Sequence, residues 1–167
     1  VTIQSVEYLQ KKFPQHDLNV VHISQRIKGI ERDETAFREI IAEVETSAGV
    51  LWTFPLYLLL VPAQYKRFIE LIFERGAQDA FAGKYTAAIS TSIHFYDHIA
   101  HRYVQGICDD LDMKFTGSFS ADMLDLLNEQ EKERLVQFGT HFFDAFENQH
   151  ATSKRFMPLK EREFEYA

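Results

Sequence analysis

The sequence predicts an α/β fold, a doubly wound parallel sheet with helices on both faces. Three observations support this prediction. Apolar runs typical of strands alternate with segments whose apolar residues recur at helical spacing, the connections between them are short, and the strand runs are apolar almost throughout. Strict alternation indicates parallel pairing, because a helix returns the chain to the same end of the sheet. Strands covered on both faces need apolar residues on both faces, as these runs have.

Helices are expected where apolar residues recur every three or four positions. Asp33 opens an acidic first turn of one such segment, Gly76 is expected to weaken the end of another, and Asn128 is expected to cap the last. The segments are residues 1–13, 33–47, 63–81, 97–113 and 128–150.

Strands are expected at four short apolar runs rich in β-branched residues. The runs are residues 18–24, 48–54, 85–92 and 114–121, and the polar stretch before Asp33 is interpreted as a connection. Residues 151–167 show no clear periodicity. We therefore expect one domain over residues 1–150, followed by a C-terminal extension or a linker to a further domain over residues 151–167.

Composition excludes several classes of partner. The net charge is −7 and no block of Lys or Arg occurs, which argues against nucleic acid. The longest apolar run, FPLYLLLVPA, is too short to cross a bilayer, and no basic-then-apolar signal peptide opens the chain, so no membrane partner is expected. The single cysteine, Cys108, allows no internal disulfide and favours a reducing, cytoplasmic location.

Ligands of open α/β sheets bind outside the carboxyl ends of the strands. Two of the loops that follow these ends are rich in aromatic and hydroxyl side chains, as a flat and partly polar ring requires. The candidate cofactor-binding residues are Thr53, Phe54, Pro55, Leu56 and Tyr57 in one loop, and Thr91, Ser92, Ile93, His94 and Tyr96 in the other.

The stretch GVLWTFPLYLLLVPAQYKRFIELI resembles a region of the flavodoxin-like NAD(P)H-dependent FMN reductases and iron-sulfur flavoproteins. In those proteins an apolar strand leads into Pro-x-Tyr and then into a helix that begins near Pro-Ala-x-x-Lys. The stretch ISTSIHFYDHIAH resembles their second ring-side loop. The resemblance covers residues 1–149, and the matching residues in the first stretch are Pro55, Tyr57, Val61, Pro62, Ala63, Lys66 and Phe68.

The resemblance implies bound FMN, with NAD(P)H as co-substrate and a quinone, a flavin or a protein as electron acceptor. The flavin carries the chemistry, so no catalytic side chain is required. It also implies a homodimer, in which aromatic residues of the two ring-side loops complete the partner's site. No close group of cysteines is present, so an iron-sulfur centre is not expected.

The family's first strand and its phosphate-binding turn are not visible in this sequence. In the flavodoxin-like strand order 2-1-3-4-5 that strand is central, and a sheet without it exposes unpaired edges. We therefore expect that the strand precedes Val1 or that another segment supplies it.

Several alternatives remain open from the residues alone. In one alternative the chain is an electron-carrier module without nicotinamide turnover. In another it is an interaction domain that has lost the flavin. Tyr57 is alternatively a core residue at a turn, and the second loop a polar turn in which Asp97 caps the next helix. His94, His98 and His101 have a spacing that zinc accepts, but no metal site is predicted because solvated or hydrogen-bonded histidines are more common.

Overall fold

The computed structural model describes residues 2–94, 96–122 and 124–157. Its sheet has three parallel strands in the order β1-β2-β3, namely β1 (Gly49–Pro55), β2 (Tyr85–Thr91) and β3 (Lys114–Ala121). The central strand β2 is buried along its whole length. The predicted parallel α/β architecture is confirmed.

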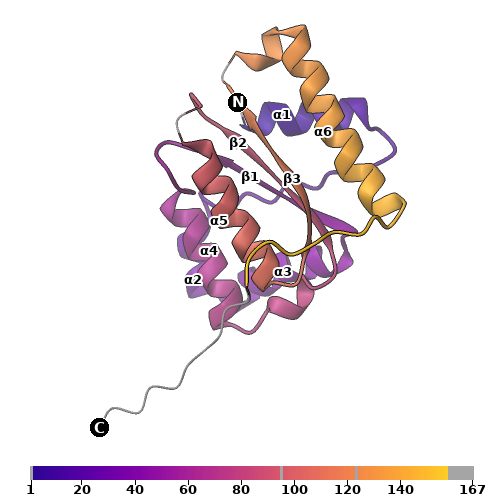
Figure 1. Cartoon of the computed structure of the whole chain (residues 1–167). Helices are drawn as coiled ribbons and strands as arrows, with labels where there is room; N and C mark the ends of the chain where they lie inside the picture. The colour runs from indigo at the N-terminus through magenta and orange to yellow at the C-terminus, as the bar shows by residue number, and fades with distance from the viewer. Residues whose placement is uncertain (1, 95, 123, 158–167) are drawn as a thin grey trace.

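Helices cover both faces of the sheet (Figure 1). One face packs against α1 (Thr2–Lys12) and α6 (Glu129–Glu147), and the other against α3 (Glu34–Thr46), α4 (Ala63–Glu74) and α5 (Asp97–Asp110). Successive β2 side chains alternate between these layers because strand side chains point to opposite faces. The fold is therefore doubly wound, as predicted.

The helix ends follow local chemistry. The side chains of Asp33 and Asn128 each accept a 2.9 Å hydrogen bond from a backbone N–H two residues on, which starts α3 and α6. Gly76 adopts φ +60°, and the N–H of Ala77 donates to the carbonyl of Ile72 at 2.9 Å. This Schellman ending stops α4 at Glu74, earlier than the helix predicted over residues 63–81, and a short 3-10 helix (Gln78–Ala80) follows.

Two predicted elements are wrong. Residues 18–24 form no strand, because no other strand among the residues that the structure describes pairs with them. The stretch taken as a polar connection contains a short helix, α2 (Ile27–Arg32). Its two isoleucines, Ile27 and Ile30, lie three residues apart and are both buried. A single apolar pair in six residues is too weak a pattern to predict a helix.

The residues that follow α6 form an extended strap, residues 151–157, that runs from the end of α6 to the C-terminal end of α5 (Figure 1). Buried Asp109 holds the strap by accepting from the backbone N–H groups of Arg155 and Phe156, both at 2.9 Å. Residues 158–167 of the predicted extension lie outside the described residues, and the domain boundary at residue 150 stays a prediction. Within the described chain, no helix is both long and apolar enough to cross a membrane.

Candidate functional site

The loops that follow the three strands begin at one edge of the sheet. Pro55, the last residue of β1, pairs with Thr91, the last residue of β2, and the N–H of Leu56 donates to the Thr91 carbonyl at 2.9 Å. The N–H of Ser92 donates to the carbonyl of Ala121 at the end of β3, also at 2.9 Å. Parallel strands thus bring the two predicted ring-side loops side by side.

The loop after β1 alternates between core and surface. Phe54 is fully buried against Tyr65, and Leu56 is buried too, so neither side chain is available to a ligand. Thr53 is half-buried within β1, and its N–H donates to the hydroxyl of Tyr65, whose pKa burial raises. Tyr57 is 82% exposed, which rules out a core role for it.

The loop after β2 has an unusual backbone. His94 (φ +59°) and Tyr96 (φ +58°) both lie in the left-handed region, which residues with a Cβ rarely adopt. Ile93 is 78% exposed and Tyr96 is 49% exposed, so apolar surface faces outward beside polar groups. Non-glycine residues in this conformation persist where the surroundings hold them, and they gather at functional sites.

Asp97 is the group that holds this loop. Its buried carboxylate accepts from the hydroxyl of Ser92 at 2.7 Å and from the hydroxyl of Ser120 on β3. Nδ1 of His94 lies 3.2 Å from the same carboxylate. Burial opposes ionisation of Asp97, but the hydrogen bonds from Ser120, Ser92 and His94 prevail and lower its pKa.

The interpretation of Asp97 as a helix cap is wrong. Tyr96 occupies the cap position of α5 without a side-chain hydrogen bond, and Asp97 is the first helical residue. The left-handed turn at Tyr96 lets the helix start one residue earlier than a cap at Asp97 requires. The carboxylate is therefore free to join β2, β3 and α5 through their side chains.

His94 has one ring nitrogen held and a half-exposed ring. The carboxylate of Asp97 and the hydroxyl of Ser120, 3.3 Å away, both approach Nδ1. The side chain is 53% exposed, which leaves Nε2 available to a molecule at the edge of the sheet. A carboxylate on one nitrogen orients the ring and fixes the tautomer, as in many acid–base sites.

The other two histidines are not gathered with His94. Nε2 of His101 lies 2.8 Å from the hydroxyl of Ser90 on β2, and burial lowers the pKa of His101. His98 is exposed on α5. Over the described ranges, no group of three or more His, Cys, Asp or Glu side chains is placed to bind a metal. Cys108 is fully buried, and burial raises the pKa of its thiol to about 12.

The sequence analysis did not place Ser120 at the site, although the rule that selected the other loops also applies to the end of β3. It passed over Ser120 because no aromatic residue of its loop suggested a ring. Thr91, by contrast, was predicted, and its hydroxyl lies 2.6 Å from that of Thr2 at the start of α1.

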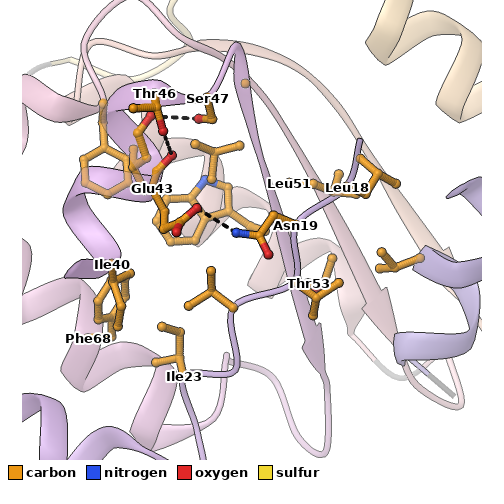
Figure 2. Close-up of a pocket in the computed structure, with 18 of the residues that line it drawn as sticks. Leu18, Asn19, Ile23, Ile40, Glu43, Thr46, Ser47, Leu51, Thr53 and Phe68 are labelled. Carbon is orange, nitrogen blue, oxygen red and sulfur yellow. Dashed lines mark hydrogen bonds between the residues drawn. The ribbon is translucent and has the colours of Figure 1, made fainter. Parts of the chain in front are cut away.

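A cavity of about 410 Å³ lies away from these loops, along the outer edge of β1. Figure 2 shows Leu18, Asn19, Leu51 and Thr53 on one side of the cavity, and Ile40 of α3 and Phe68 of α4 on the other. None of the predicted ligand-binding residues except Thr53 lines this cavity.

Three solved structures share the fold at low sequence identity. An oxidoreductase from Corynebacterium diphtheriae has a TM-score of 0.70 at 14% identity, over 90% of each chain. The apo form of the NADH:FMN oxidoreductase EmoB has a TM-score of 0.68 at 16% identity, over 85% of this chain and 80% of that one. The flavoenzyme NAD(P)H:(acceptor) oxidoreductase FerB from Paracoccus denitrificans has a TM-score of 0.63 at 18% identity, over 89% of this chain and 90% of that one.

No curated protein sequence matches the chain. A family model described as the flavodoxin-like fold matches residues 1–140, which is most of the sequence. The parallel sheet, the helices on both faces and the loops gathered at its carboxyl edge agree with this match. The chain belongs to the flavodoxin-like fold family.

Proposed function

We propose that this protein is an FMN-dependent NAD(P)H oxidoreductase that passes electrons to a quinone, a flavin or a protein acceptor. Solved structures that share its fold include an NADH:FMN oxidoreductase and an NAD(P)H:(acceptor) oxidoreductase. The proposal extends their named activities to this chain, with FMN as cofactor and NAD(P)H as co-substrate in the cytoplasm.

One observation carries the proposal: an apolar and a polar loop meet at the carboxyl edge of the sheet. Tyr57 and Ile93 present exposed apolar surface there, and Ser92 and His94 present hydroxyl and imidazole groups beside it. An isoalloxazine ring has apolar faces and a polar rim, and this surface offers contacts to both. The residues therefore fit the flavin ring.

Each side chain has a defined task in this proposal. Tyr57 lies against a ring face, and the N–H of Ile93 donates to the ring's polar edge, because the N–H groups of Ser92 and His94 already donate to Ala121 and Ser92. Asp97 fixes the loop through Ser92 and Ser120. Bound FMN supplies the hydride chemistry, while the protein orients it and limits access to it.

An absorbance spectrum tests the proposal. The protein is mixed with FMN and then, without oxygen, with NADPH or NADH. We expect protein-bound flavin bands that bleach with one of the nicotinamides. Bands that bleach with neither would identify an electron carrier, and failure to bind FMN would overturn the flavin proposal and leave an interaction domain.

A variant locates the site. Tyr57→Ala removes an exposed side chain that makes no core contact, so it is expected to weaken FMN binding without lowering stability. Met157→Ala, a change at a residue 84% exposed on the strap, is the control. Equal FMN affinity in the Tyr57 variant and the control would place the ring elsewhere.

We also propose a homodimer with the ring-side loops at its interface. Apolar side chains that are exposed at the carboxyl edge come from the loops after all three strands, and monomers rarely expose large apolar patches. They are Tyr57, Leu58, Leu59, Leu60, Ile93, Tyr96, Leu124 and Leu127.

A further inference from the structure

His94 is a titratable side chain that stands beside exposed apolar surface at the carboxyl edge of the sheet. Its side chain is 53% exposed, and the residue before it, Ile93, is 78% exposed. Tyr96, two residues on, is half-exposed as well. An imidazole that is half in solvent can take up a proton from water and pass it to a bound molecule.

The surroundings of Nδ1 fix the position of one ring proton. Burial opposes ionisation of Asp97, but the hydrogen bonds from Ser120 and Ser92 lower its pKa, so the group is a carboxylate with no proton to donate. The hydroxyl of Ser120 donates to that carboxylate, so its oxygen, 3.3 Å from Nδ1 of His94, can only accept from the ring. Nδ1 therefore carries a hydrogen, which it shares with the carboxylate of Asp97 at 3.2 Å.

Backbone hydrogen bonding holds the ring in the same place. The N–H of His94 donates to the hydroxyl oxygen of Ser92 at 2.8 Å, and that hydroxyl donates to Asp97 at 2.7 Å. Within this turn His94 adopts φ +59°. A ring that is fixed by its backbone and by one nitrogen loses little freedom when a ligand arrives, so its other nitrogen is preorganised.

Nε2 is the ring nitrogen that remains for a ligand. The hydrogen bonds of the His94 ring to residues that the structure describes all involve Nδ1. When the ring is protonated, both nitrogens carry hydrogen, and the hydrogen on Nδ1 stays with the carboxylate. The proton that leaves is then the one on Nε2, and the half-exposed ring regains it from water. This arrangement is that of a general acid held by a carboxylate.

A proton donor suits only some of the proposed acceptors. A quinone becomes a quinol by taking a hydride, which brings two electrons and one proton, and then one further proton. A metal centre in a protein acceptor takes electrons without that proton. Quinones are also flat and apolar with oxygen at their edge, and Tyr57 and Ile93 offer exposed apolar surface in the two adjacent loops. The side chains at this edge therefore favour a quinone.

We infer that His94 is a catalytic residue that protonates a quinone acceptor through Nε2, and that Asp97 is the residue that positions its ring. The nicotinamide co-substrate supplies the hydride by way of the flavin, and the quinone oxygen that becomes negative takes its hydrogen from Nε2. An O–H bond forms, the N–H bond breaks, and its electron pair stays on the neutral imidazole. The inference rests on the proposed function and adds the class of acceptor and the proton donor to it.

The rate of flavin reoxidation tests the inference. Protein with bound FMN is reduced without oxygen by NADH or NADPH and then mixed with duroquinone or, separately, with ferricyanide, which takes single electrons and no proton. The variant is His94→Asn, because asparagine tolerates the left-handed backbone of this position better than most side chains. The control is His141→Asn, the same change at an exposed histidine of α6.

We expect His94→Asn to slow reoxidation by duroquinone about 100-fold, as is typical when a general acid is removed, and to leave reoxidation by ferricyanide unchanged. The control should change neither rate. Equal losses with the two acceptors, or no loss with duroquinone, would overturn the inference alone. Wild-type flavin that neither nicotinamide bleaches would overturn the proposed function, and the assignment of the acceptor would fall with it.

A second measurement needs neither flavin nor turnover. Nitrogen NMR of the histidine side chains, in the wild type and in Asp97→Asn without flavin, shows which nitrogen of the neutral His94 ring carries the hydrogen. We expect Nδ1–H in the wild type, and a gain of the Nε2–H form in the variant because an amide can donate to Nδ1. Nε2–H in the neutral wild-type ring would overturn the inference. An unchanged ring in the variant would show that Asp97 does not position it.

Discussion

At the scale of single residues, Asp97 organises the candidate site. It contacts Ser92 after β2, Ser120 on β3 and His94 in the loop between β2 and α5. Each of these partners is an ordinary polar residue, and no sequence pattern around them predicts that their side chains form a hydrogen-bonded network. The network exists because parallel pairing brings the ends of β2 and β3 to the first turn of α5.

Replacing Asp97 by asparagine tests this network. The variant keeps the shape but loses charge-assisted hydrogen bonds, so its free energy of unfolding at pH 7 should fall by about 1–3 kcal/mol. The folded-state pKa of Asp97 is lowered, so its stabilisation is present above the unfolded pKa of about 3.9 and is lost as pH falls through the folded value. Urea unfolding at pH 7 and below pH 4 should therefore show that the difference in unfolding free energy between the wild type and the variant is smaller in acid. Asp79→Asn, at an exposed residue, is the control, and an equal effect there would contradict the assignment.

His101 contributes a second pH dependence. Its folded-state pKa is lowered, chiefly by burial, so the unfolded chain takes up the proton first as pH falls below about 6.5. Stability should decline between pH 7 and pH 5, and His101→Gln should flatten that decline. His98→Gln removes only a minor cause of the lowered His101 pKa, the repulsion from the neighbouring His98 ring, so it should flatten the slope much less than His101→Gln does. A wild-type slope in the His101 variant would show that another group titrates.

At the scale of elements, hydrophobic periodicity located the long helices and three strands, and most of their ends within a few residues, although α4 ends at Glu74 and not at residue 81. The cores of α3, α4 and α6 follow it because each helix buries one stripe against the sheet. Residues 18–24 have the composition of a strand, but no described strand lies beside them to pair with. Strand pairing depends on neighbouring segments and not on the composition of one run.

The close approach of β1 and β2 at Gly49 requires a residue without a side chain. A Cβ at Gly49 would lie 2.8 Å from the backbone carbonyl oxygen of Tyr85 and 3.3 Å from Phe142. Since that carbonyl belongs to the sheet and cannot move aside cheaply, Gly49→Ala should lower the free energy of unfolding by about 1–3 kcal/mol. Gly29→Ala in α2 meets no atom within 4 Å and should be neutral or slightly stabilising. Denaturant unfolding of both variants measures these changes. A Gly49 variant as stable as the wild type would contradict the close contact between Gly49 and the Tyr85 carbonyl.

The strap depends on one buried carboxylate. Asp109→Ala removes the acceptor for the N–H groups of Arg155 and Phe156, so the strap should detach and trypsin should cut faster after Lys154 and Arg155. Asp112→Ala removes an exposed ion pair with Lys154 at 2.6 Å, which contributes little, so it should change cleavage much less. Equal cleavage of the two variants would show that Asp109 is not the anchor.

At the scale of the whole molecule, the chain gathers exposed apolar side chains at one end of its sheet. The loops after β1, β2 and β3 meet at this end, which is why residues distant in sequence form one patch. Such a patch is typical of an interface.

The proposed dimer predicts a charge-sensitive assembly. Leu58 is 61% exposed in the loop after β1, so Leu58→Glu should leave the monomer folded but shift sedimentation towards the monomer. Met157→Glu, at a residue that is 84% exposed on the strap, should leave the assembly unchanged. A wild-type protein that sediments as a monomer at all concentrations would refute the dimer.

The sequence by itself determined the fold class, the alternation of strands and helices, the edge of the sheet that carries the candidate site, and the loops that form it. These follow from local patterns, namely the period of apolar residues and the rule that parallel strands end together. Only the tertiary structure decided that residues 18–24 pair with none of the strands it describes, that Asp97 joins three elements, and that a cavity lies along β1. Each of these depends on which segments lie beside one another in space, and no local pattern in a sequence records that.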